Sequence, residues 1–356
     1  MKSLNAVQQN VSKRFPRYVA GGMDPNDFER ILPLVDSWDR WLDLLRQFGD
    51  ERVQLAEQAT QERHQLTAAE AFVQGALYYH FGQLAYFEND VRKQQMRNLS
   101  VKTFQRGSGW IDPPVKRLEI SYEGVRLVGH LRVPKGFEKP GCVFLLPGVD
   151  STKEEMHTFE KYFLDRGVAT LAFEGPGQGE TVDVLAMSDD YETALSVAID
   201  FLEREVHQID ATRLAVYGRS MGGHLAPRAA AFEPRIKAVI SAGGIYDLSY
   251  WDKLPVGVKH NFRYAWRLKT LEEAAQRAKR VSLEGIVEKI RCPFLVLHSG
   301  QDTTFPAEGA RRMAKEAQCP TQLVIYEEGT HVCDNITYKY RPLVADWTAD
   351  QLSRAK

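Results

Sequence analysis

The stretch Val216-Tyr217-Gly218-Arg219-Ser220-Met221-Gly222 decides the fold of this 356-residue chain. The apolar residues before Gly218 are typical of a short buried strand, and the alanine-rich residues 221–231 are typical of a helix. A strand that turns so sharply into a helix needs small residues at the turn, and Gly218 and Gly222 supply them. Ser220 at the apex is therefore predicted to present its hydroxyl as a nucleophile. The pattern is short enough to arise by chance, so this interpretation depends on partners elsewhere in the chain.

Short apolar runs alternate with helical segments from residue 116 onward. Residues 117–122 and 125–133 flank Glu123-Gly124 and predict a hairpin. The further apolar runs are 142–146, 168–173, 214–217, 238–241, 294–298 and 323–326. Uninterrupted apolar runs indicate strands buried on both faces. The sequence therefore predicts an α/β fold with a mostly parallel, doubly wound sheet, whose ligands bind at the carboxyl ends of the strands.

Two candidate catalytic partners each follow a predicted strand. Asp302 comes after the run 294–298, and His331 comes after the run 323–326. An aspartate in a turn or a histidine in a loop is unremarkable alone. The order Ser220, Asp302, His331 is, however, that of the α/β-hydrolases. In this triad His331 would take the proton of Ser220, and Asp302 would fix the imidazole tautomer.

An oxyanion hole needs two backbone donors close to the nucleophile. The N–H of Met221, directly after Ser220, is predicted to be one, and the N–H of Val149, in the loop after the run 142–146, is predicted to be the other. Gly148 would allow the backbone to approach the substrate closely. The glycine-rich residues 174–179 lack the spacing of a phosphate-binding loop and are interpreted as a structural turn near the site.

The composition excludes several classes of function. The formal net charge is −1 and 44% of the residues are hydrophobic, so we expect neither a nucleic-acid partner nor a membrane surface. No apolar run reaches the length of a membrane span, and the polar N-terminus suggests no signal peptide. The four cysteines show no metal-binding spacing. We therefore expect a cytoplasmic protein with reduced thiols, no metal and no cofactor.

The chain is predicted to have two domains. Residues 1–112 contain helical patterns with little strand character, and Gly and Pro residues at 107–114 mark a boundary. Residues 113–356 form the α/β domain, in which residues 245–286 are too long for one crossover and predict a helical insertion.

The N-terminal region is predicted to be a cap that forms part of the substrate pocket. Its helix from Thr67 is apolar around much of its surface, more than one packing face needs. Tyr78, Tyr79 and His80 give that helix polar tips that suit an aromatic substrate. The alternative is a separate helical module beside a self-sufficient hydrolase.

Several short motifs resemble one known family. They are Ser151-Thr-Lys-Glu-Glu155, Phe173-Glu-Gly-Pro-Gly-Gln-Gly-Glu180, Gly218-Arg-Ser-Met-Gly-Gly223 and Tyr250-Trp-Asp252. Together they are similar to the 2,6-dihydroxypseudooxynicotine hydrolase family and to the broader FrsA-like esterases. The resemblance implies an α/β-hydrolase with an N-terminal helical cap, a homodimer, and hydrolysis of a carbon–carbon bond beside a ketone in an aromatic or polyketide-like compound.

The resemblance also implies an acidic residue near the nucleophile, for which Asp247 and Asp252 are both candidates. Substrate contacts are expected from Tyr78, His80, Asp247, Trp251 and Asp252. The alternatives are a carboxylesterase acting on small or aryl esters, an acyltransferase on the same fold, and a non-catalytic regulator, which would usually have lost a triad member.

Overall fold

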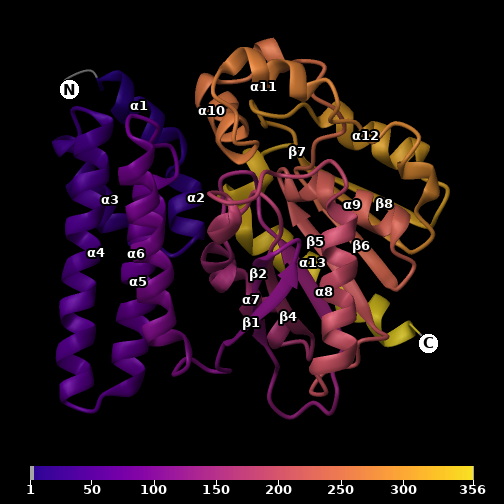
Figure 1. The fold of residues 1–356 in the computed structure, drawn as a ribbon, viewed down its shortest axis with the longest axis horizontal. Helices are drawn as coiled ribbons and strands as arrows, with labels where there is room; N and C mark the ends of the chain where they lie inside the picture. The colour runs from indigo at the N-terminus through magenta and orange to yellow at the C-terminus, as the bar shows by residue number, and fades with distance from the viewer. Residues whose placement is uncertain (1–3, 356) are drawn as a thin grey trace. The chain divides into compact units, whose positions relative to one another are not determined.

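The computed structural model describes residues 4–355, which form two compact units (Figure 1). The helical unit comprises the chain up to Lys116 together with Glu154–Thr158. The sheet unit comprises Arg117–Lys153 and everything from Phe159 onward. No sequence pattern marks Glu154–Thr158 as part of the helical unit, because the chain on either side of this short segment belongs to the sheet unit.

Three long helices and three short ones build the helical unit (Figure 1). They are α1 (Ala6–Lys13), α2 (Phe15–Ala20), α3 (Pro25–Ile31), α4 (Trp38–Gln61), α5 (Gln65–Gln83) and α6 (Asp90–Ser108). Helix α5 begins at Gln65, two residues before the predicted start at Thr67, and every residue from 75 to 83 is buried. Its apolar surface therefore meets the other helices of its own unit, which accounts for the excess noted in the sequence.

Two tyrosines of the helical unit each donate a hydrogen bond to an aspartate of helix α4. The Tyr79 hydroxyl donates to Asp50 and the Tyr86 hydroxyl donates to Asp39, both over 2.5 Å. Burial, followed by the hydrogen bond to Asp39, raises the pKa of Tyr86 to about 12. These phenols stay neutral at physiological pH, and the carboxylates satisfy the hydroxyl groups of two buried tyrosines.

The sheet unit is built on eight strands in the order β1-β2-β4-β3-β5-β6-β7-β8. The strands are β1 (Lys116–Tyr122), β2 (Val125–Arg132), β3 (Cys142–Leu146), β4 (Ala169–Glu174), β5 (Leu214–Arg219), β6 (Ile236–Ala242), β7 (Phe294–Ser299) and β8 (Thr321–Tyr326). Strand β2 runs antiparallel to β4, and all pairs from β4 to β8 are parallel. The predicted mostly parallel sheet is confirmed.

Helices cover both faces of this sheet (Figure 1). They are α7 (His157–Leu164), α8 (Tyr191–Glu205), α9 (Gly222–Phe232), α12 (Ala307–Glu316) and α13 (Thr337–Arg354). Two further helices, α10 (Val256–Ala265) and α11 (Leu271–Ala278), fall in residues 245–286 and lie at the top of Figure 1, beyond the strands. Val216 of β5 shares one core with Leu195 of α8 and Leu225 of α9. Its neighbour Tyr217 points to the opposite face, where its ring lies 4.9 Å from that of Phe159 in α7. The alternation along β5 thus fixes which helices lie on which side.

The turn between β5 and α9 has the geometry that the sequence predicts. Ser220 has a φ of +56°, in the left-handed region that a serine rarely adopts. A Cβ added to Gly218 would lie only 1.8 Å from the carbonyl oxygen of Gly222. The backbone of the first helical turn therefore approaches the strand so closely that only glycine fits at 218.

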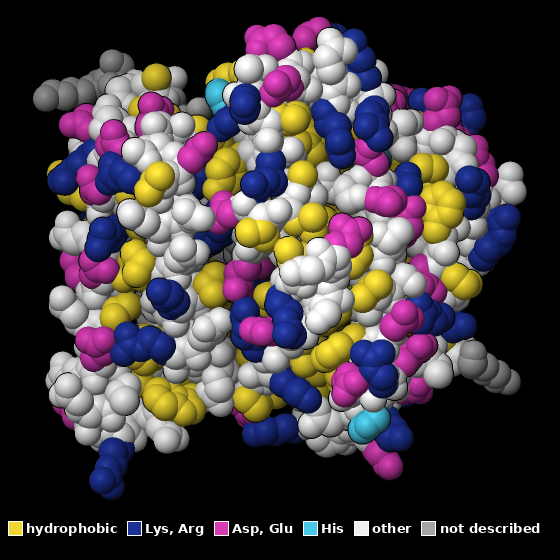
Figure 2. Space-filling view, viewed as in Figure 1, with side chains coloured by type: hydrophobic (Ala, Val, Ile, Leu, Met, Phe, Trp, Pro, Cys, Tyr) yellow, Lys and Arg dark blue, Asp and Glu magenta, His cyan; other side chains and the backbone are white. Residues whose placement is uncertain are grey.

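Basic and acidic side chains are interspersed over the face of the molecule drawn in Figure 2. This mixture agrees with the formal net charge of −1. Within residues 4–355, no helix combines the length and apolar character needed to cross a membrane.

Replacement of Gly218 by alanine tests the packing of the turn. Because the added methyl group would overlap the Gly222 carbonyl, we expect Gly218→Ala to lower the free energy of unfolding by about 3 kcal/mol. Urea denaturation measures this change. The control is Gly109→Ala, where a Cβ meets nothing within 4 Å. Equal stability of the two variants would contradict the close packing.

Candidate active site

The carboxyl ends of β5, β7 and β8 bring Ser220, Asp302 and His331 together. The Nε2 atom of His331 lies 3.1 Å from the Ser220 hydroxyl oxygen, and its Nδ1 atom lies 2.7 Å from Asp302 Oδ2. Parallel strands end at the same edge of a sheet, which is why residues more than 80 positions apart in sequence can meet. The arrangement gives His331 an acceptor nitrogen facing the serine and a donor nitrogen facing the carboxylate.

The Asp302 side chain is fully buried, and hydrogen bonds hold both of its oxygens. Its Oδ1 accepts from the backbone N–H groups of Thr304, at 2.8 Å, and Phe305, at 3.0 Å. Burial alone would raise the pKa of Asp302, but the charge and hydrogen bond of His331, with the Phe305 N–H, hold it below its ordinary value. The ring of Phe305 lies 5.3 Å from that of His331, edge to face. An ionised carboxylate and an aromatic wall therefore orient the imidazole.

Two backbone N–H groups are available beside Ser220. Within residues 4–355, neither the Val149 N–H nor the Met221 N–H has a hydrogen-bond acceptor. The loop carrying Val149 passes close to the nucleophile, since a Cβ added to Gly148 would lie 3.3 Å from the Ser220 Cβ. Unpaired donors at this position suit a site that holds a developing negative charge.

The glycine-rich loop after β4 supports the loop that carries Val149. Gln178 donates from its Nε2 to the Pro147 carbonyl oxygen over 2.9 Å. Its own Oε1 accepts from the Tyr191 hydroxyl at 2.8 Å and from the Gly175 N–H at 3.1 Å. The predicted structural turn thus has a second role, which its sequence does not reveal: it fixes the position of the neighbouring loop.

A buried ion-pair network fixes the other end of that loop. Lys153 is fully buried; its Nζ lies 3.1 Å from Glu174 Oε2 and 2.7 Å from Glu180 Oε1. The backbone N–H of Lys153 also donates to Glu174 Oε1 over 2.9 Å. Burial would raise the pKa of Glu180, but Lys153 and Arg117 lower it, so the pairs stay ionised. Lys153 lies four residues after Val149, which limits the movement of that donor.

Three predicted substrate contacts follow strand β6 and differ in exposure. Asp247 is partly buried, and its Oδ1 accepts from the Ser249 N–H over 2.9 Å. Trp251 is buried, with its ring 5.9 Å from that of Phe262, whereas Asp252 is exposed. Trp251 is therefore a core residue, and its indole packs against other aromatic side chains.

Tyr250 is a candidate site residue that the sequence did not single out. Burial raises its pKa, and the carboxylates of Asp247 and Asp302 raise it further. Its phenol is therefore a neutral donor within the electrostatic reach of Asp302. The charge of Asp247 also acts on the pKa of this phenol, whereas Asp252 is exposed.

Tyr78 and His80, the two substrate contacts predicted in the helical unit, both have hydrogen-bond partners within that unit. The Tyr78 hydroxyl donates to Asp27, and the ring is buried. The His80 Nε2 lies 3.1 Å from Glu155 Oε2, and Arg17 Nε donates to Glu155 Oε1 over 2.7 Å. A role of either side chain in substrate binding stays a prediction.

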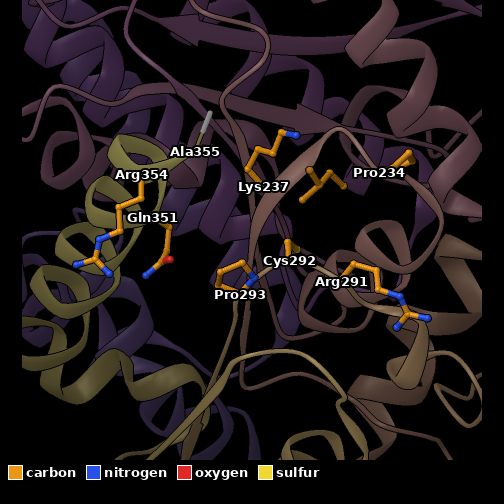
Figure 3. Close-up of a pocket in the computed structure, with 9 residues that line it drawn as sticks. Pro234, Lys237, Arg291, Cys292, Pro293, Gln351, Arg354 and Ala355 are labelled. Carbon is orange, nitrogen blue, oxygen red and sulfur yellow. The ribbon is translucent and has the colours of Figure 1, made fainter.

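A pocket of about 350 Å³ lies at the opposite ends of the strands (Figure 3). Lys237, Cys292 and Pro293 line it at the amino ends of β6 and β7. Arg291 and Arg354 also line it, but their guanidinium groups point away from each other (Figure 3). Ligands of parallel α/β sheets bind at the carboxyl ends, so this pocket is not the candidate active site.

Metal-binding groups are sparse in the described part of the chain. No group of three or more His, Cys, Asp or Glu residues within positions 4–355 is arranged to hold a metal ion. All four cysteines are free thiols.

The fold and the geometry at the strand ends define an α/β-hydrolase. Residues 47–253 match the family model of FrsA-like esterases, and residues 158–353 match that of the prolyl oligopeptidase family. The chain belongs to the FrsA-like family of α/β-hydrolases, and it is therefore a hydrolase.

Individual relatives agree with this assignment. The 2,6-dihydropseudooxynicotine hydrolase of Paenarthrobacter nicotinovorans is 33% identical over 345 residues, which cover 96% of this chain and 92% of that protein. The 20-hydroxy-prefusarin hydrolase of Gibberella moniliformis is 31% identical over 305 residues, 72% of this chain and 73% of that protein. The crystal structure of the 2,6-dihydroxy-pseudo-oxynicotine hydrolase superposes with a TM-score of 0.89 at 31% identity, covering 96% of this chain and 97% of that one.

The tautomer of His331 tests the hydrogen bonds around it. Because Asp302 accepts from Nδ1, we expect nitrogen-15 NMR at neutral pH to place the proton of His331 on Nδ1. In Asp302→Asn, the amide can donate to Nδ1, so the proton should move to Nε2. His331→Gln assigns the signal, and substitution of the exposed His64 serves as the control. The same tautomer in wild type and Asp302→Asn would contradict the geometry.

Proposed function

We propose that this protein is a serine hydrolase in which Ser220, His331 and Asp302 form the catalytic triad. The observation that carries the proposal is the continuous contact from Ser220 through His331 to Asp302, at 3.1 and 2.7 Å. Both distances lie within hydrogen-bond reach, as required for a base that takes the serine proton and for a carboxylate that orients that base. The left-handed backbone at Ser220 supports the same role, since strain of this kind persists where a side chain must be held in an unusual direction.

The chemistry would proceed through an acyl-enzyme. The Ser220 oxygen attacks a carbonyl carbon as His331 takes the serine proton, and the N–H groups of Val149 and Met221 stabilise the oxyanion. The tetrahedral adduct collapses, the bond from the carbonyl carbon to the leaving group breaks, and His331 gives its proton to that group. Water, deprotonated by His331, then attacks the ester; the bond to the Ser220 oxygen breaks, His331 returns the proton to that oxygen, and a carboxylic acid is released.

We infer that the bond broken is a carbon–carbon bond beside a ketone, in an aromatic or polyketide-like substrate. The support is the similarity over 96% of this chain to a 2,6-dihydropseudooxynicotine hydrolase. A carbon leaving group must depart as a stabilised carbanion, such as an electron-rich aromatic carbon or an enolate. The neutral phenol of Tyr250, whose pKa the charge of Asp302 raises, is a candidate donor to that group.

Ester hydrolysis is the second candidate. The matching family model is described as an esterase, and the same triad cleaves an ester more readily because an alkoxide leaves more easily than a carbanion. Transfer of the acyl group to an alcohol or amine instead of water would use the same intermediate.

Paired substrates separate these functions. The wild-type protein should hydrolyse both an electron-rich aryl ketone and the aryl ester of the same acyl group. Ser220→Ala should lower turnover of both by about 10³-fold or more while the melting temperature is retained. Ser353→Ala, an exposed serine of the same unit, is the control. Hydrolysis of esters alone would favour the esterase, and near-normal activity of Ser220→Ala would reject the triad.

We also propose that the helical unit is a cap that contributes to the substrate pocket. The support is the path of the chain: after Val149 and Lys153 it contributes Glu154–Thr158 to the helical unit before it returns at Phe159. Only a few residues therefore separate Val149, the proposed oxyanion donor, from Glu155. The Glu155 carboxylate forms hydrogen bonds with Arg17 and His80 of the helical unit.

His80→Ala tests the cap. Loss of His80 removes one partner of Glu155, so we expect the KM for a large aryl ketone to rise several-fold. Labelling of Ser220 by a small fluorophosphonate should stay unchanged, because that probe needs only the triad. His64→Ala, at an exposed histidine of the same unit, should alter neither quantity. An unchanged KM in folded His80→Ala would leave the cap without support.

A further inference from the structure

A buried ion pair links the two loops that carry the proposed nucleophile and base. Arg219, the last residue of β5, donates from Nη2 to Asp334 Oδ2 over 2.7 Å. The side chains are 8% and 4% exposed. Arg219 directly precedes Ser220, and Asp334 lies three residues after His331. The contact therefore joins positions 115 residues apart in sequence at the point where the triad is assembled.

The loop after His331 needs such a restraint. Its 3-10 turn, His331–Ile336, contains Val332 and Cys333 in the left-handed region, with φ of 57° and 60°. A β-branched residue is disfavoured there, so this conformation persists only when surrounding contacts impose it. The Cys333 N–H donates to the Ser299 hydroxyl over 3.2 Å, which fixes the turn to the end of β7. Arg219 fixes the same turn to the end of β5.

The environment of the Asp334 carboxylate points to a positioning role and not to a substrate contact. The second oxygen of Asp334, Oδ1, is buried and has no hydrogen-bond partner within residues 4–355. Arg219 is the side-chain donor to this carboxylate, although the buried Arg341 lies within electrostatic reach of it. Breaking the pair removes that hydrogen bond from a buried carboxylate, which favours movement of the turn.

We infer that the Arg219–Asp334 ion pair positions His331 relative to Ser220, so that its loss slows the chemical step without weakening binding. This inference rests on the proposed triad. Neither residue touches the reacting atoms; both act through the backbone of the residues they adjoin. A displacement of about 1 Å between reacting groups costs on the order of 100-fold in rate.

The test measures the inactivation of the full-length protein by a fluorophosphonate, which gives the maximal rate kinact and the half-saturating concentration KI. We expect Arg219→Met to lower kinact by about 10- to 100-fold, with KI within twofold of wild type. Asp334→Asn should also lower kinact, although it removes a negative charge whereas Arg219→Met removes a positive one. Arg219→Lys, which retains the cation, should recover part of the rate.

The matched control is Arg132→Met. Arg132 Nη1 lies 3.1 Å from Glu160 Oε2, and these side chains are 4% and 2% exposed, so the pair is as buried as Arg219–Asp334. This variant should lose stability but keep kinact per folded molecule. All rates are measured well below each melting temperature.

The outcomes are distinct. If wild type is labelled at Ser220 and both Arg219→Met and Asp334→Asn keep the wild-type kinact, the positioning role is rejected while the triad stands. Opposite changes in the two variants would indicate a simple charge effect and would also reject it. If wild type itself is not labelled, the proposed function fails first. Should Arg219→Met not fold, the nearly isosteric Asp334→Asn decides alone.

Discussion

The close approach of β5 and α9 at Gly218 is the constraint on which the site depends. With no side chain at 218, the first turn of the helix packs directly against the strand, and the chain at Ser220 is forced into the left-handed region. The serine hydroxyl then leaves the turn toward the carboxyl edge of the sheet, where His331 meets it. A helix that began one residue later would bury the hydroxyl or turn it away from the imidazole.

The proposed catalytic groups lie on loops, and buried polar contacts hold these loops in place. Asp302 is held by backbone N–H groups that follow it, and the loop of Val149 is held by Gln178 at one end and Lys153 at the other. Buried polar groups are costly unless fully paired, so these contacts constrain geometry more than they add stability. Electrostatic stabilisation of a reaction needs donors that are already in place, which is what such contacts provide.

Much of this arrangement could be predicted from the sequence, because it depends on local pattern. Strand β3 has the predicted bounds of residues 142–146, and strand β5 exceeds its prediction only by Gly218 and Arg219, which continue the pairing with β6. The meeting of Ser220, Asp302 and His331 follows from strand order and parallel direction. The long-range partners could not be predicted, since nothing local marks Lys153 for Glu174. The helical patterns of residues 1–112 likewise could not show that α5 would bury its apolar surface within its own unit.

The central claim is that a carbonyl substrate is attacked by Ser220 to give an acyl-enzyme. Rapid quenching during turnover of an aryl ketone, followed by mass spectrometry of the peptide that contains Ser220, measures this intermediate directly. The account predicts a mass increase equal to the acyl half of the ketone, located on Ser220 and lost as the carboxylic acid appears. Turnover of the ketone with no adduct on this peptide, or with the adduct on another residue, would contradict it.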